Sequence, residues 1–444
     1  MHHPYGPAAG PGGPAARLPL TASGTRRIAI VSASVGAGHD GAATELARRL
    51  TAAGYGVDRH DFLDLLPARA GALIRGTYHR MLTLAPGSYQ HLYANTEECG
   101  RPGRLVGALL RCTEGRVLRA LAPGTCAVVS TYPGASQVLG RMRQSGRLAV
   151  PALTYLTDFS VHPLWIAPGI DGHLAAHHVP AGQARALGAA DVAVTGPVVD
   201  PRFTPGGTAE RRAARRRFGL PDEDKVALLV AGSWGVGSVE EAATEIRDSG
   251  AAVPVVVCGR NDALVQRLRR LGIEHAHGWV ADMPDLMRAA DVLVQNAGGL
   301  TSLEAFASGL PVASYRCIPG HGQTNAAALE QAGLAAWIRR PDELAPVLRA
   351  LMAGPLGSRQ RRLGLALYTT GPGPAAAITA ASGHPATTAR PVRGARVASL
   401  TRRRLGLAAA ALTVTVTLAI GIPVADAYSD APVHLATHQV QGGR

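Results

Sequence analysis

The sequence predicts an α/β protein in which two successive series of strands and helices each form a domain. Three observations lead to this prediction. Short, continuous apolar runs alternate with segments of helical period, which is typical of parallel sheets covered by helices. A glycine-rich loop follows the first strand of each series, at residues 33–39 and 231–237. The chain has 444 residues, 47% of them apolar, which is enough for two such domains.

The first series follows a Pro/Gly/Ala-rich leader, residues 1–25, that we expect to be disordered. Residues 27–32 form a continuous apolar run suited to a central parallel strand, and residues 41–53 have helical period. Four more strands are expected, at residues 127–130, 152–156, 173–176 and 192–195. The series defines an N-terminal domain over residues 26–197.

The alternation of strands and helices is interrupted near residues 196–200, and an Arg-rich helix is expected at residues 209–218. The second series defines a C-terminal domain over residues 198–353. Its strands are expected at residues 226–230, 253–257, 275–278, 292–294 and 311–314. The two series predict two Rossmann-like domains that face each other across a cleft.

The C-terminal part predicts a membrane attachment. Residues 354–404 form a basic linker rich in Gly, Pro, Ala and Thr. Residues 405–425 carry no charge, follow three arginines and are long enough for one transmembrane helix. The arginines place residues 1–404 in the cytoplasm at the cell membrane, and residues 426–444 form an extracytoplasmic tail. A buried core helix is the alternative, or an internal signal, since Ala425-Asp-Ala427 resembles a signal-peptidase site.

The charge distribution favours an anionic membrane surface as a partner. The net charge is +14, and residues 344–425 contain ten Arg and no acidic residue. A nucleic-acid binder usually spreads basic and aromatic residues over its folded body, whereas aromatic residues make up 4% here, so we expect no nucleic-acid partner. The five cysteines show no metal-ligand spacing and predict reduced thiols in a cytosolic domain.

Two loops of the first domain carry candidate site residues. Gly36, Gly38 and His39 lie between a strand and a helix, where backbone N–H groups favour an anion or an oxyanion; an ordinary tight turn is the alternative. Asp158, followed by His162 and Trp165, marks a loop that we interpret as acceptor-facing. A solvated loop is one alternative, and a metal site with residues 177–178 is another.

The second domain carries the candidate phosphate loops. Gly232 and Ser233 follow its first strand, where backbone amides can contact phosphate. Further on, two glycines open a turn, hydroxyl residues can cap the next helix and an acid follows; these are Gly298, Gly299, Thr301, Ser302 and Glu304. The alternative for Glu304 is a capping box. His321, Gln323 and Asn325 precede another helix, and the DxD sequence at 222–224 is interpreted as a solvated turn.

In their order and spacing, these motifs resemble the monogalactosyldiacylglycerol synthase family over residues 26–350. They resemble more distantly the bacterial N-acetylglucosaminyltransferase that makes lipid II. The motifs are Ser34…Gly38-His39, Thr157-Asp158…His162…Trp165, Gly196-Pro197…Pro201, Asn296-Ala-Gly-Gly299…Glu304-Ala305…Gly309-Leu-Pro311 and Pro319-Gly320…Asn325. The first glycine loop departs from a Gly-Gly-Gly-His run, and His321 stands where plant members tend to have Gln.

The resemblance implies a GT-B fold and a transferase that inverts the sugar's anomeric centre without a metal or other cofactor. By position, Glu304 would bind the ribose of UDP, and Gly298, Gly299 and Ser302 its diphosphate. His321, Gln323 and Asn325 would face the donor sugar. His39 would face the acceptor as the catalytic base, with Asp158 as the rival base or as the group that orients His39.

The expected function is therefore transfer of a hexose from a UDP-sugar to a lipid hydroxyl such as that of diacylglycerol, in glycolipid synthesis. A UDP-sugar 2-epimerase, which shares the fold, is the alternative from another enzyme class. A non-catalytic nucleotide-sugar-binding protein is the third reading.

Overall fold

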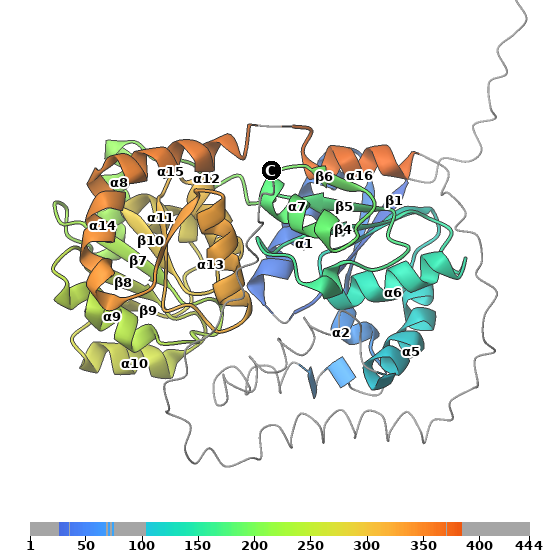
Figure 1. The fold of residues 1–444 in the computed structure, drawn as a ribbon, viewed down its shortest axis with the longest axis horizontal. Coiled ribbons are helices and arrows are strands. Elements are labelled where there is room, and N and C mark those ends of the chain that lie inside the picture. The colour runs from blue at the N-terminus through green and yellow to red at the C-terminus, as the bar shows by residue number, and fades with distance from the viewer. Residues whose placement is uncertain are drawn as a thin grey trace, which may run out of the picture.

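A computed structural model describes residues 26–34, 36–67, 70–71, 73–74, 104–369 and 371–383 of the chain. These residues form two α/β domains that lie side by side in Figure 1, each built on a six-stranded parallel sheet. The two Rossmann-like domains expected from the sequence are therefore confirmed, and two such sheets are the arrangement expected of a GT-B-like fold.

The N-terminal sheet has the strand order β2-β1-β3-β4-β5-β6. Its strands are β1 (Arg27–Ser32), β2 (Gly56–Asp61), β3 (Thr125–Ser130), β4 (Ala152–Tyr155), β5 (Gly172–Ala175) and β6 (Val192–Val194). The helices of this domain are α1 (Ala37–Ala52), α2 (Phe62–Leu65), α5 (Arg104–Ala120), α6 (Pro133–Gln144) and α7 (His178–Ala186), with a short 3-10 helix η1 (Pro163–Trp165). In the middle of the sheet, Ile30 of β1 pairs with Arg59 and with Val129.

The C-terminal sheet has the order β12-β11-β10-β7-β8-β9. Its strands are β7 (Val226–Val230), β8 (Val253–Val257), β9 (His275–His277), β10 (Val292–Gln295), β11 (Val312–Tyr315) and β12 (Ala335–Ile338). The helices are α8 (Thr208–Phe218), α9 (Val239–Asp248), α10 (Asp262–Arg270), α11 (Met283–Ala289), α12 (Leu300–Ala307), α13 (His321–Gln331), α14 (Leu344–Ala353), α15 (Pro355–Ala366) and α16 (Pro374–Ser382), with η2 at Pro341–Glu343.

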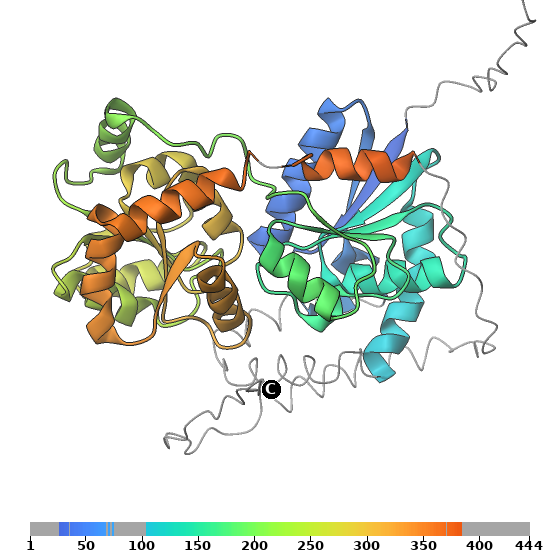
Figure 2. The ribbon, with the colours of Figure 1, turned by 45° about the horizontal axis from the view of Figure 1, so that its top comes forward.

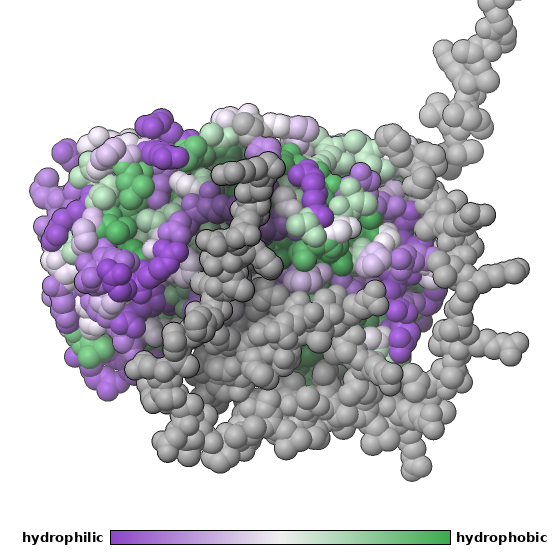
Figure 3. All heavy atoms as spheres, in the orientation of Figure 1, coloured by the Kyte–Doolittle hydropathy of each residue, from purple (hydrophilic) through white to green (hydrophobic). Residues whose placement is uncertain are grey.

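Apolar residues on both faces of each sheet build the cores. In β1, Ile28 and Ile30 belong to one hydrophobic cluster, while Ala29 and Val31 belong to the cluster on the other face. This alternation is why the strand is a continuous apolar run in the sequence. Outside the cores, hydrophilic and hydrophobic side chains are mixed over the face seen in Figure 3.

Every expected strand is present, but the sequence prediction missed β2 and β12. Both are edge strands of their sheets. β2 has the sequence Gly-Val-Asp-Arg-His-Asp, in which charged residues hide the strand pattern, and an ion pair between Arg27 and Asp58 joins it to β1. An edge strand needs only one neighbour and little apolar surface, so its sequence signal is weak.

The linker prediction for residues 354–404 needs a correction, because residues 355–382 hold α15 and α16. α15 packs against α12 and α14, and α16 then packs against α1 and β3 of the other domain. Ile378 is fully buried there, and the Arg26 guanidinium donates to the Ser382 carbonyl at 2.5 Å. Figure 2 shows the two helices running along the same side of the molecule. One buried isoleucine among alanines is enough to anchor α16.

Within the described ranges, no helix has the length and apolar character needed to cross a membrane. The predicted transmembrane segment 405–425 lies outside the described residues. The same holds for the leader 1–25, for residues 384–404 of the linker and for the tail 426–444.

Candidate functional site

The strand order of each sheet reverses beside its first strand, between β1 and β3 and between β7 and β10. Ligands of such sheets bind outside the carboxyl ends of the strands at this reversal. The two carboxyl edges meet in this molecule, since a Cβ on Gly38 of α1 would lie 3.8 Å from the Cβ of Leu300 of α12. The candidate site therefore lies at the junction of the two domains.

His39 lies in the first turn of α1, and its ring orientation is fixed. Its Nδ1 is 2.8 Å from the carbonyl oxygen of Thr131 and 3.1 Å from the Thr157 hydroxyl. A ring nitrogen that faces a carbonyl oxygen carries the proton, so Nε2 carries the lone pair. Nε2 makes no hydrogen bond to the described residues. The arrangement holds His39 as a proton acceptor.

Asp158 follows β4 and is held by Trp165, whose indole Nε1 donates to its Oδ2 at 3.1 Å. Trp165 is only 1% exposed and belongs to a hydrophobic cluster. His162 is also buried, and its Nδ1 accepts from the backbone N–H of Leu164 to begin η1. The acceptor-facing role expected for His162 and Trp165 is thus corrected: the structure uses both to build the loop that carries Asp158.

His321, the first residue of α13, brings the donor-side domain to the same place. Burial lowers the pKa of His321, and nearby His39 acts in the same direction, while Asp158 opposes the shift. His39, Asp158 and His321 therefore lie near one another at the domain junction. The sequence had placed the three residues on two different domains without showing that they meet.

Glu304 lies in α12, is half-buried and makes no hydrogen bond or ion pair with the described residues. Burial, together with the negative charge of Asp200, raises the pKa of Glu304 to about 7. The capping-box alternative does not hold. α12 begins after Gly299, which has no side chain to cap the helix. The acid of a capping box is the third helical residue, which is Ser302 here, and Glu304 lies two positions further on. The carboxylate is left for another partner.

The glycine loops provide the backbone groups of the site. Gly298 has a φ of 74°, and a Cβ there would lie 2.8 Å from the Cβ of Asn325, so only glycine fits. Gly232 also has a positive φ, of 67°. The Asn296 amide donates to the Val236 carbonyl at 2.7 Å and joins the loops that follow β7 and β10.

The helix start after these loops is uncapped. Gly299 precedes α12 without a side-chain cap, which leaves the first backbone N–H groups of the helix for an anion. Thr301 is half-buried there, and Ser302 is fully buried, with an Oγ that has no hydrogen-bond partner among the described residues. The diphosphate position expected for Gly298, Gly299 and Ser302 stays a prediction.

The side-chain amide of Asn325 is bonded within the protein. It is 1% exposed, its Oδ1 accepts from the Ser160 backbone N–H at 2.7 Å, and its Nδ2 donates to the Ala297 carbonyl at 3.1 Å. The Ser160 and Thr324 hydroxyls lie 2.9 Å apart beside it. The expected donor-sugar role of Asn325 is therefore corrected to an interdomain contact. Gln323, two residues before it, is exposed.

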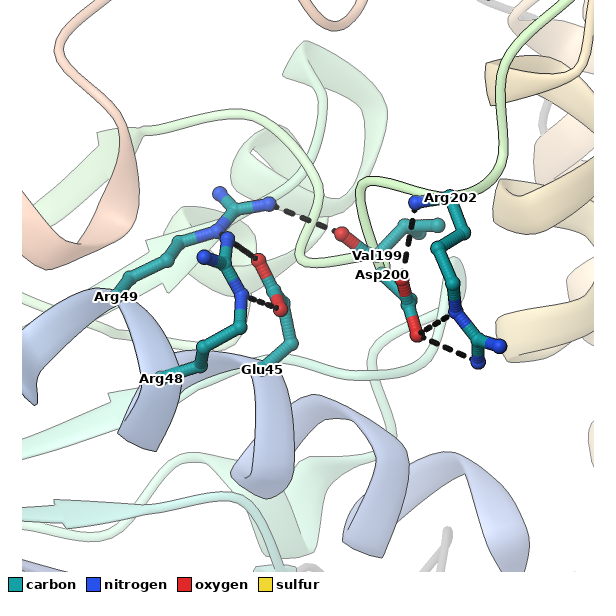
Figure 4. A network of polar contacts seen from close by, with 6 residues as sticks. All are labelled: Glu45, Arg48, Arg49, Val199, Asp200 and Arg202. Atoms are coloured by element: carbon teal, nitrogen blue, oxygen red, sulfur yellow. Dashed lines mark hydrogen bonds and ion pairs between the residues drawn. The ribbon is translucent and has the colours of Figure 1, made fainter. Parts of the chain in front are cut away.

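Residues 196–203 connect the domains and are held from both sides. From α1, the Arg49 guanidinium donates to the Val199 carbonyl at 3.2 Å (Figure 4). From α11, the Arg288 guanidinium donates to the Arg202 carbonyl at 2.6 Å. Asp200, between these two points, forms an ion pair with Arg202. The negative charge of Asp200 contributes, after burial, to the raised pKa of Glu304.

Sequence reasoning missed the residues that complete the site. Thr131 and Thr157 hold His39, Ser160 and Thr324 join the domains, and no local pattern distinguishes these hydroxyl residues from ordinary loop residues. Among the described residues no group of three or more His, Cys, Asp or Glu is placed to hold a metal ion. His177 caps α7 by accepting from the Val179 N–H at 3.2 Å. The DxD residues Asp222 and Asp224 are exposed in the turn before β7.

Comparisons with known proteins agree with this division. Residues 39–199 match the family model described as "Monogalactosyldiacylglycerol (MGDG) synthase", and residues 228–353 match "Glycosyl transferases group 1". A "Processive diacylglycerol beta-glucosyltransferase" of Bacillus pumilus is 31% identical over 49% of this chain and 58% of its own length. The Bacillus subtilis protein of the same name is 29% identical over 51% of this chain and 60% of its own length.

The chain thus spans about 60% of the length of the curated relatives it matches. Among solved structures, MurG of Acinetobacter baumannii is similar, with a TM-score of 0.48 and 14% identity over 80% of this chain and 98% of that one. Most residues of the motifs that suggested the resemblance lie within the two matched regions, while Ser34, Gly38 and Pro201 lie outside them. The chain is thus similar to MGDG synthases over residues 39–199 and to group 1 glycosyl transferases over residues 228–353.

Proposed function

We propose that the chain is an inverting glycosyltransferase that moves a hexose from a UDP-sugar to the hydroxyl of a lipid, with diacylglycerol as the acceptor class. One observation carries the proposal. His39, with one ring nitrogen held by a backbone carbonyl, lies near Asp158 and His321 at the domain junction, and its helix α1 contacts the uncapped helix α12 that carries the unpartnered carboxylate of Glu304. The printed names of the Bacillus relatives support a diacylglycerol acceptor.

In the proposed reaction, residues 26–197 bind the acceptor and residues 198–353 bind the donor. The Nε2 of His39 takes the proton of the lipid hydroxyl as its oxygen attacks the anomeric carbon. The bond from that carbon to the UDP oxygen breaks in the same step, so the configuration inverts. The N–H groups at the start of α12 and at Gly298 stabilise the negative charge that develops on UDP.

The proposal also assigns the donor contacts. Glu304 accepts hydrogen bonds from the two ribose hydroxyls, for which its carboxyl group must be ionised. Gly232 and Ser233 contribute backbone groups to the phosphates, and Gln323 and His321 border the sugar. Asp158 orients the reacting groups or, as the rival of His39, takes the proton itself.

The test is incubation of the full chain with radiolabelled UDP-glucose, UDP-galactose or UDP-N-acetylglucosamine and diacylglycerol vesicles, followed by analysis of the lipid extract. Label in a β-linked glycolipid from one donor supports the proposal and identifies the hexose. Release of UDP with a changed free sugar and no labelled lipid would support the 2-epimerase instead. Binding of UDP without any turnover would support the non-catalytic protein.

We further propose that residues 405–425 span the membrane and hold both domains at the anionic cytoplasmic surface. Diacylglycerol resides in a bilayer, so an enzyme that acts on it must work at a membrane surface. The Arg-rich residues before the segment support this orientation.

A further inference from the structure

The guanidinium of Arg260 lies exposed at the carboxyl edge of the C-terminal sheet, over the faces of two indole rings. Arg260 follows β8, and its guanidinium lies 5.6 Å from the ring centroid of Trp234 and 5.1 Å from that of Trp279. Trp279, after β9, is 56% exposed. Neither the resemblance nor the comparisons give Arg260 a role.

The backbone around Arg260 is locked to the glycine loop that follows β7. The Arg260 N–H donates to the Ser233 carbonyl at 3.0 Å. The preceding Gly259 has a φ of 61°, and a Cβ there would lie 2.5 Å from the carbonyl group of Ser233, so only glycine allows this approach. The end of β8 and the loop after β7 thus form one unit.

The guanidinium of Arg260 makes no hydrogen bond or ion pair with any described residue. Two arginines of the next helix, α10, do have polar partners. Arg267 pairs with Glu240 at 2.6 Å, and Arg269 donates to the Ala276 carbonyl at 3.2 Å. The charge of Arg260 is therefore not used by the fold.

Stacking between two indoles restricts the side chain without using its donors. A cation above a ring face is attracted by the ring quadrupole, while the five N–H groups remain in the guanidinium plane. A restricted arginine loses less conformational freedom when it binds, and its planar fork matches the oxygens of a phosphate group. The Trp234–Arg260–Trp279 arrangement is suited to an anion with several oxygens.

The place of Arg260 in the sheet indicates which anion it can reach. In the sheet, β7 lies between β8 and β10, so Arg260 stands on one side of the loop after β7 and the Gly298–Gly299 loop stands on the other. Adjacent strands lie about 4.8 Å apart, which puts the ends of β8 and β10 about 10 Å apart, within reach of an arginine side chain. We propose that Arg260 binds the pyrophosphate of the nucleoside diphosphate donor, opposite the start of α12. This inference rests on the proposed function.

The test compares Arg260→Ala with the parent by calorimetry, using UDP and uridine as separate ligands. A pyrophosphate contact predicts that the variant binds UDP about tenfold or more weakly and binds uridine within about twofold of the parent. Arg260→Lys, which keeps the charge but not the planar fork, should fall between the two. Arg270→Ala is the matched control, because it removes an exposed arginine of α10 and should leave UDP affinity unchanged.

Unchanged UDP affinity in Arg260→Ala would overturn the inference, and so would equal losses for UDP and uridine, which would assign Arg260 to the nucleoside. Trp279→Leu provides a second test and should weaken UDP binding a few-fold without a change in melting temperature. If the parent protein binds neither ligand, the proposed function fails together with this inference. If the parent binds UDP and the Arg260 variants bind UDP equally well, the inference fails while the proposed function stands.

Discussion

At the scale of single residues, His39 and Glu304 hold the two protonation states on which the proposed reaction depends. The Thr131 carbonyl oxygen fixes the proton of His39 on Nδ1, which leaves Nε2 as the acceptor. Burial and the negative charge of Asp200 raise the pKa of Glu304 to about 7, so its carboxyl group is partly protonated near neutral pH. In the proposed reaction, the carboxyl group of Glu304 must lose a proton when the donor binds.

Replacement of His39 by alanine should lower kcat by about 10²–10⁴ and leave UDP affinity and melting temperature close to those of the parent, since a general base contributes to the chemical step and not to donor binding. Steady-state kinetics with a UDP-sugar and diacylglycerol, together with calorimetry, measure both. If His39→Ala keeps kcat within about tenfold of the parent while Asp158→Asn is inactive, Asp158 is the base.

The pKa of Glu304, raised to about 7, predicts a pH-dependent affinity for uridine. Below this pH the carboxyl group is protonated and must ionise to accept both ribose hydroxyls, so affinity should fall by about tenfold in total as the pH drops from 8 to 6. Uridine is the better ligand here, because the phosphates of UDP titrate in the same range. Glu304→Gln should bind uridine weakly at every pH, and a parent profile as flat as that of Glu304→Gln would contradict the role.

The raised pKa of Glu304 also affects the stability of the fold, and this effect changes with pH in the opposite direction to uridine affinity. An acid whose pKa is higher in the folded state than in the unfolded state stabilises the fold at low pH, below its unfolded value. This contribution is lost as the pH rises through about 7. Donor binding and the stability of the unliganded protein therefore respond to pH in opposite directions through one side chain.

At the scale of elements, the turn from β10 into α12 depends on one glycine and not on its neighbour. Gly298 has a φ of 74° and is packed against Asn325, whereas Gly299 has a φ of −85° and no atom within 4 Å of a Cβ placed on it. The pair offers an internal control, since the two residues are adjacent in the proposed phosphate loop.

Gly298→Ala should lower the free energy of unfolding by about 1–2 kcal/mol for the left-handed backbone alone, with a further cost from the contact with Asn325. It should also weaken UDP binding, because the loop must shift. Gly299→Ala should leave the free energy of unfolding near that of the parent. Denaturant unfolding measures both, and equal losses in the two variants would show that the loop conformation is not what limits substitution at Gly298.

At the scale of the whole molecule, two distant sets of contacts join the domains. The helices α15 and α16 cross from one domain to the other, and Asn325 connects the loop after β4 with the loop after β10. Donor-side and acceptor-side loops are thus bonded to the same buried amide.

Asn325→Ala would leave the Ser160 N–H and the Ala297 carbonyl without partners, and each buried unsatisfied group costs about 1–3 kcal/mol. We expect a lower melting temperature together with weaker UDP binding. Thr324→Val is the control, since it removes hydroxyl contacts, among them those with Ser160 and with the His321 carbonyl, but keeps the Asn325 amide, and it should have the smaller effect. A normal melting temperature and UDP affinity in Asn325→Ala would show that this contact is dispensable.

The membrane proposal also belongs to this scale. With residues 405–425 as a single span and the domains inside, a reporter enzyme that works only outside the cytoplasm should be active when fused after Arg444. The protein should also stay with the membrane fraction in a carbonate wash. Release by carbonate, or activity of a cytoplasm-dependent reporter at the same position, would contradict the span.

The sequence alone determined the two α/β series, the glycine loops after β1, β7 and β10, and the residue types at the site. These features are local: an apolar run buried on both faces, or a glycine with a positive φ, leaves its signature in a few neighbouring residues. The strands β2 and β12 and the helix α16 escaped prediction because each depends on a neighbour far away in the chain. β2 is completed by β1, and α16 by α1 and β3.

Only the tertiary structure decided what the candidate residues do. Trp165 and Asn325 carry functional groups that suit a binding site, yet their partners, Asp158 and Ser160, occupy them within the protein. Arg260 shows the reverse, an arginine with no sequence signal whose charge is left unpaired among the described residues. Whether a polar side chain is satisfied by the fold or is available to a ligand depends on contacts between segments distant in sequence, and local sequence carries no record of them.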